Sequence, residues 1–192
     1  MTGDESERFM RIVCADPINA ALLERLAALR IENGFLVAGC LFQTYWNHLA
    51  GRPGSQGIKD YDIFYFDGRD LSYEAEDAVL TRIRAATADL GIAIDVKNQA
   101  RVHLWYERRF GHAYPPLQSC EDGIERYLVA CTCLGIAVED RRLYAPNGFG
   151  ELSAGLLRRN PNNSCDRARF LEKAESYRAR WPWLRIMDEP LA

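Results

Sequence analysis

Hydrophobic positions in the first fifty residues change from helical spacing to a continuous run and back to helical spacing. After Pro17, three leucines recur on one helical face, and Asp16 is the type of residue that caps a helix N-terminus. Residues 35–38 are wholly apolar, which predicts a short strand buried on both faces. Residues 41–49 form an aromatic-rich helical pattern. We therefore expect a helix, a buried strand and a second helix in this order.

Two more strands are predicted, with a helix between them. Residues 60–66 end in four β-forming side chains and predict a strand. A helical pattern extends from Ser72, a typical cap, to residue 90, and Gly91 is expected to end it. Residues 92–96 alternate aliphatic side chains with other residues, which predicts the next strand.

This order of elements indicates an α/β (α+β) fold, with a small mixed sheet backed by helices. From about residue 107 the chain predicts a mainly helical portion, with helices over 120–132 and 166–180 and a strand near 136–138. A length of 192 residues is that of one domain. We expect residues 1–192 to form a single domain, with its core at about 16–106 and a C-terminal portion at about 107–192.

Composition and charge limit the classes of partner. Hydrophobic residues make up 48% of the chain and charged residues 27%, which permits a sizeable core. The net charge of −3 provides no general attraction to nucleic acid or to an anionic membrane. No apolar run is long enough to span a bilayer, and residues 1–8 are polar and acidic, unlike a signal peptide. A cytoplasmic location is expected by default.

Three carboxylates stand at strand positions. Asp60 and Asp62 are two residues apart, so both project to one side of their strand while Tyr61 points to the other. Two close carboxylates repel each other unless a cation or a proton lies between them, and such oxygen ligands suit magnesium. Asp95 interrupts the aliphatic pattern of the next strand. The alternative for each is an ordinary solvated charge at a strand edge.

Cysteine and histidine positions leave two questions open. Four of the six cysteines lie among apolar residues, as reduced core cysteines do. A zinc site built from Cys131, Cys133, Cys120 and His112 is an alternative, although the spacing is unlike the usual paired ligands. His103 lies in a polar and aromatic stretch and is either a hydrogen-bonded structural residue or a catalytic group.

The ordered motifs resemble the polymerase-beta-type nucleotidyltransferase superfamily, which includes the CCA-adding enzymes and the antibiotic nucleotidyltransferases. The matching segments are Phe35 to Gly39, Asp60-Tyr61-Asp62 and Ile94-Asp95-Val96. The string from Asp95 to Tyr106 is similar to a bacterial nucleotidyltransferase-like branch of this superfamily, and Tyr144-Ala145-Pro146 extends the resemblance towards the C-terminus. The resemblance implies a nucleotidyltransferase-like domain, similar to the head domain of a CCA-adding enzyme.

The resemblance also implies roles for particular residues. Asp60, Asp62 and Asp95 would bind Mg²⁺ and carry catalysis, with Asp95 serving the attacking group. Backbone N–H groups after Gly39 would hold the phosphates. The chain departs from the family pattern at Cys40, where a Gly or Ser is usual, and in a longer interval between Gly39 and Asp60.

Two cations and Cys40 complete the predicted nucleotide site. Cys40 would contribute the start of its helix, and Lys97 and Arg101 are candidates to neutralise phosphate charge. A solvated surface position is the alternative for both cations.

The resemblance favours a magnesium-dependent nucleotidyltransferase, which moves a nucleoside monophosphate from a nucleoside triphosphate to an unknown acceptor hydroxyl. The acceptor is a small molecule, a protein or RNA; neither DNA nor a membrane is expected. One alternative is a non-catalytic module that binds nucleotide or metal and keeps the fold. Another is an RNA-binding component, against which the sequence pI of about 5.7 counts.

Overall fold

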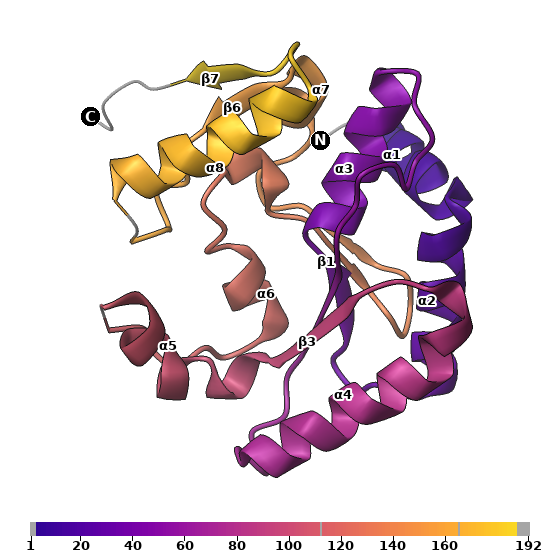
Figure 1. The fold of residues 1–192 in the computed structure, drawn as a ribbon, viewed down its shortest axis with the longest axis vertical. Helices are drawn as coiled ribbons and strands as arrows, with labels where there is room; N and C mark the ends of the chain where they lie inside the picture. The colour runs from indigo at the N-terminus through magenta and orange to yellow at the C-terminus, as the bar shows by residue number, and fades with distance from the viewer. Residues whose placement is uncertain (1–2, 112, 165, 188–192) are drawn as a thin grey trace.

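Figure 1 shows the computed structural model of the chain, which describes residues 3–111, 113–164 and 166–187. Its α-helices are α1 (Gly3–Ala15), α2 (Pro17–Ala28), α3 (Gly39–Leu49), α4 (Tyr73–Thr87), α5 (His103–Phe110), α6 (Cys120–Ile124), α7 (Gly150–Ala154) and α8 (Arg167–Arg180). Its strands are β1 (Phe35–Val37), β2 (Tyr61–Tyr65), β3 (Ile94–Asn98), β4 (Gly135–Ala137), β5 (Leu143–Tyr144), β6 (Leu156–Arg158) and β7 (Arg185–Met187). Short 3₁₀ helices cover Ala88–Leu90, Gln99–Arg101 and Ala130–Thr132.

Five strands form the main sheet in the order β3-β2-β1-β4-β5. β2 and β3 are parallel, and the other neighbours are antiparallel. The parallel pair is joined through α4, as a parallel connection requires. The α/β fold class and the pairing of the Asp60 strand with the Asp95 strand are thereby confirmed.

The two faces of the sheet are covered differently. Leu36, Ile63 and Ile94 point into a large hydrophobic core that α1, α2 and α3 help to form. On the opposite face, a smaller cluster around Phe35 and Val37 is closed by α6. In Figure 1, α1 and α2 lie to the right of the sheet, and α5 and α6 lie to its left.

The C-terminal portion contributes to the same core. Trp46 of α3 packs against Trp181, with ring centroids 5.4 Å apart, and the Trp181 indole N–H donates to the Asn47 side chain at 3.0 Å. β4 and β5 complete the main sheet, while β6 and β7 form a separate parallel pair. None of the helices in the described ranges is both long enough and apolar enough to cross a membrane.

Local capping predictions are confirmed. The Asp16 carboxylate accepts hydrogen bonds from the backbone N–H groups of residues 18 and 19, and the Ser72 hydroxyl accepts one from residue 75. Gly91 adopts the left-handed conformation that ends the helix and its 3₁₀ extension, with φ of 63°. The third strand begins two residues later than expected, at Ile94.

The predicted helix over residues 120–132 is wrong. α6 ends at Ile124, and the chain continues irregularly to an isolated bridge between Val129 and Arg159. Gly123 weakens the helix, and a side chain there would approach the Gln99 amide oxygen within 2.3 Å. The long-range pairing of Val129 thus overrides the local helical pattern. α1 was not anticipated; its buried face carries Phe9 and Val13, four residues apart.

Candidate active site

β2 carries Asp62, and Asp60 directly precedes β2; both line a cleft of about 400 Å³. Tyr61 is 2% exposed and packs in the core, whereas Asp62 is half-buried, so the alternation predicted for this strand is present. Asp62 pairs with Val37 of β1 in the antiparallel register of the two strands. The cleft is lined by Ala38, Gly39, Phe42, Gln43, Asp60, Asp62, Tyr106, Phe110, Arg126, Tyr127, Leu128, Val129, Thr132, Asn163, Arg169, Lys173 and Tyr177.

Asp95 lies beside Asp62 in the parallel register of β2 and β3. Paired residues of neighbouring strands project to the same face, so the two carboxylates belong to one row. Asp95 lines a second hollow that adjoins the first, and its Oδ1 accepts a hydrogen bond from the Lys97 ammonium at 2.6 Å. The row of carboxylates therefore lies between two hollows.

Burial and repulsion act together on Asp62. The pKa of its carboxyl is raised to about 7, first by loss of solvent and then by the negative charges of Asp60 and Asp95. The positive charges of Lys173 and Lys97 oppose this rise. These five groups are close enough to influence one another, so strand and helix residues distant in sequence form one electrostatic cluster.

The Gly39 turn forms another wall of the same cleft. β1 ends at Val37, and α3 begins at Gly39 after Ala38, which has φ of 62° and ψ of −132°. A Cβ at Gly39 would lie 2.5 Å from the Gln43 amide nitrogen. The first N–H groups of an α-helix lack intrahelical partners, so this end of α3 favours an anion.

Cys40 contributes no side chain to the cleft. It is fully buried, and its thiol donates a hydrogen bond to the Val37 carbonyl oxygen at 3.2 Å. Burial raises the pKa of the thiol well above its ordinary value. Any contact between this residue and a phosphate would therefore be made by its backbone N–H.

Basic and aromatic residues of the C-terminal portion form the outer wall, and the sequence analysis missed them. Arg169 and Lys173 are four residues apart on α8, and both line the cleft, as does Arg126. The Arg169 guanidinium lies over the Phe110 ring of α5, 4.8 Å from its centroid. In the sequence, these two residues form a basic i, i+4 pair on the predicted helix over 166–180. No neighbouring sequence feature indicates that this pair lies near the acidic strand.

The two cations predicted from the sequence do not line the first cleft. Lys97 and Arg101 line the second hollow. Arg101 is buried, forms an ion pair with Glu76 and donates from its Nε to the Leu71 carbonyl oxygen at 3.1 Å. The structure thus groups Gly39 with Asp60 and Asp62, and groups Lys97 and Arg101 with Asp95.

The zinc alternative finds no support in the described residues. No three His, Cys, Asp or Glu side chains within them form a group that could hold a metal ion. Cys133 instead accepts a hydrogen bond from the Asn160 amide at 3.4 Å, and Cys131 is buried in the core. His112 lies outside the described residues. His103 is half-buried, and its Nδ1 lacks a hydrogen-bond partner in the described part of the chain.

The donor atoms of the cleft fit magnesium better than zinc. Asp60 and Asp62 offer carboxylate oxygens, and the pKa of Asp62 is raised by burial and then by repulsion from Asp60 and Asp95, a repulsion that a cation would relieve. Magnesium is commonly bound by one or two carboxylates together with substrate phosphates, rather than by a complete cage of protein ligands. The lack of a three-ligand group among the described side chains is compatible with such a site.

Comparison with known proteins agrees with this geometry. A solved structure described as revealing a CCA-adding enzyme head domain superposes with a TM-score of 0.75, covering 98% of each chain at 19% identity, which shows a common fold. No curated protein sequence matches the chain. The sequence model of a family described as "Nucleotidyltransferase" matches residues 24–186, from α2 to β7. The resemblance to the polymerase-beta-type nucleotidyltransferases is thereby confirmed, and the chain belongs to this nucleotidyltransferase family.

Proposed function

We propose that the protein is a magnesium-dependent enzyme of the cytoplasm that moves a nucleoside monophosphate from a nucleoside triphosphate to an acceptor hydroxyl. Nucleotidyl transfer in general follows from the family. One observation carries the specific proposal: Asp60 and Asp62 line the same cleft as the Gly39 turn, and Asp95 stands beside Asp62 on the next strand.

The triphosphate would lie between the Gly39 turn and α8. Unpaired N–H groups at the start of α3 donate to phosphate oxygens. Lys173 and Arg169 on the opposite wall supply positive charge. Lys173 is close enough to Asp62 for its charge to lower the pKa of that carboxyl. The rings of Tyr106 and Phe110 offer apolar surface for the base.

Asp60 and Asp62 would hold the metal, with the phosphates completing its coordination. When bound there, magnesium would lower the pKa of an attacking hydroxyl and would neutralise charge on the leaving pyrophosphate. Asp95 would accept the hydroxyl proton. Lys97 orients the Asp95 carboxylate by bonding one of its oxygens, which leaves Oδ2 for the proton.

The test is a screen of the four nucleoside triphosphates with magnesium, which follows pyrophosphate release and mass shifts on candidate acceptors. Asp60→Asn and Asp62→Asn should abolish release, whereas Asp77→Asn, an exposed carboxylate of α4, should not. Triphosphate binding without pyrophosphate release under any condition would instead identify a non-catalytic binding module. Failure of all four triphosphates to bind would refute the proposal.

A further inference from the structure

The second hollow has a volume of about 970 Å³ and adjoins the first cleft at Phe110. We call it the acceptor hollow because Asp95, the proposed proton acceptor, lines it and is absent from the lining of the first cleft. Its lining is Tyr73, Glu76, Asp95, Lys97, Arg101, Leu104, Trp105, Arg108, Arg109 and Phe110.

The charge of the acceptor hollow is unbalanced. Its two carboxylates are already paired, Asp95 with Lys97 and Glu76 with Arg101. The remaining cations, Arg108 and Arg109, are exposed near the end of α5. Two guanidinium groups without a carboxylate partner in the lining favour an anionic ligand, and guanidinium groups match phosphate in geometry.

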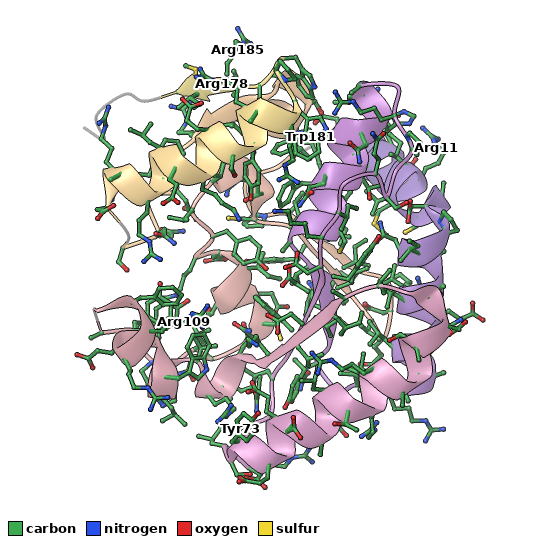
Figure 2. The ribbon with its side chains drawn as sticks, viewed as in Figure 1. Arg11, Tyr73, Arg109, Arg178, Trp181 and Arg185 are labelled. Atoms are coloured by element: carbon green, nitrogen blue, oxygen red, sulfur yellow. The ribbon has the colours of Figure 1, made fainter. Side chains whose placement is uncertain are left out.

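The same hollow displays apolar surface. Tyr73 and Leu104 are the large hydrophobic residues exposed in the described part of the chain, at 65% and 56%, and both line it. The Arg101 guanidinium lies 5.9 Å from the centroid of the Tyr73 ring, which supports one face of the ring. Figure 2 shows Tyr73 at the start of α4 and Arg109 on α5, both in the lower left of the view. Exposed rings beside arginines are the combination on which unpaired bases stack.

We propose that the acceptor hollow binds the acceptor, and that this acceptor is a nucleotide unit with a free ribose hydroxyl, at the end of a single RNA strand or as a free mononucleotide. This inference rests on the proposed function. The base stacks on Tyr73 or Trp105, and phosphate is held by Arg108 and Arg109. The chain's overall negative charge does not oppose this, because the positive charge required is local.

In the proposed reaction, the acceptor and the triphosphate lie on either side of the row of carboxylates. The ribose hydroxyl oxygen attacks the α-phosphorus of the triphosphate in the first cleft, and a phosphodiester bond forms. The bond to pyrophosphate breaks, and the hydroxyl proton passes to Asp95. Donor and acceptor approach from the two hollows that flank Asp62 and Asp95.

The test measures acceptor binding apart from activity. A short 5′-fluorescein-labelled single-stranded RNA and a nucleoside 5′-monophosphate are titrated separately, with a saturating non-hydrolysable triphosphate filling the first cleft. The variants are Arg108→Gln/Arg109→Gln and Tyr73→Ala. The charge-matched control is Arg178→Gln/Arg185→Gln, two exposed residues that Figure 2 places at the opposite end of the molecule. Triphosphate binding is measured in parallel for every protein.

We expect the wild type and the control to bind at least one probe. The variant Arg108→Gln/Arg109→Gln should bind that probe at least tenfold more weakly. For RNA, the slope of the logarithm of the binding constant against the logarithm of the salt concentration should become shallower by about 1.4, the value for two phosphate contacts. Tyr73→Ala should weaken binding through lost stacking. Binding of RNA alone, or of the mononucleotide alone, identifies which form is the acceptor.

Equal binding by all variants, or no binding of either probe, would overturn the inference. So would a mass shift on a protein hydroxyl with no transfer to RNA or mononucleotide. If the triphosphate binds and releases pyrophosphate while both probes fail, the acceptor assignment alone is wrong. If the triphosphate itself fails to bind, the proposed function is wrong.

Discussion

Replacing Asp62 by Asn should stabilise the metal-free protein, because it removes a carboxylate that repels its neighbours. Burial and the charges of Asp60 and Asp95 raise the pKa of this group from 3.8 to about 7 in the folded state. Without screening by solvent, this difference in pKa between the folded and unfolded states would destabilise the folded protein by about 4 kcal/mol above pH 7. Because the side chain is only half-buried, solvent screening reduces the effect, and we expect about 1–3 kcal/mol.

The pH dependence has a definite sign. Below pH 3.8 the carboxyl is protonated in both folded and unfolded states, so it contributes no difference in stability. Between about 4 and 7 the unfolded state loses its proton while the folded state keeps it, and the wild type loses stability as pH rises. Asp62→Asn lacks this group, so its stability should change less over the same range.

Urea unfolding of both proteins at several values of pH, without divalent metal, measures this difference. Near pH 8 we expect Asp62→Asn to have the larger free energy of unfolding, and thermal unfolding should give a melting temperature higher by about 2–4 °C for each kcal/mol. The control is Asp77→Asn, which removes an exposed carboxylate and should change the free energy of unfolding by less than about 0.5 kcal/mol. If Asp62→Asn is equally or less stable at pH 8, the carboxylates do not form a repulsive cluster.

Three further predictions concern ligand binding. Magnesium should raise the melting temperature of the wild type through mass action. Asp60→Asn and Asp62→Asn should abolish this shift, whereas Asp95→Asn should keep more of it but lose nucleotidyl transfer. Identical thermal shifts in all four proteins would contradict the metal assignment. Gly39→Val should weaken triphosphate binding more than it lowers the melting temperature, because near Gly39 the new side chain meets the Gln43 side chain and no backbone atom. Calorimetric affinity equal to wild type in the folded variant would remove the turn from the site. Lys173→Gln should weaken triphosphate binding at least tenfold, and unchanged affinity would place this cation outside the site.

The parts of the site that were predictable from sequence depend on local geometry. The period of a strand places Asp60 and Asp62 on one side, and cap residues such as Ser72 mark helix starts without reference to the rest of the chain. The parallel neighbour that carries Asp95 follows from the helix between the two strands. Each of these inferences uses one continuous stretch of sequence, the longest of which runs from β2 through α4 to β3.

The opposite wall of the cleft could not be found in this way. Lys173 and Arg126 line the cleft of the carboxylates only because the tertiary fold brings α8 and the segment after α6 to it. The incorrect helix over 120–132 has the same origin, since Val129 is held by pairing with a residue thirty positions later. Long-range packing decides these positions, and local propensity carries no information about it.

The conformation of Ala38 links the fold to the proposed chemistry. Its positive φ of 62° with ψ of −132° is a region that residues other than glycine rarely occupy, at a cost of about 1–3 kcal/mol. The strain persists because both flanks are fixed: Val37 is paired on both sides within the sheet, and α3 is buried along most of its length. The strain therefore keeps the start of α3 in the same cleft as the carboxylates, as the proposed binding of a metal and phosphates requires.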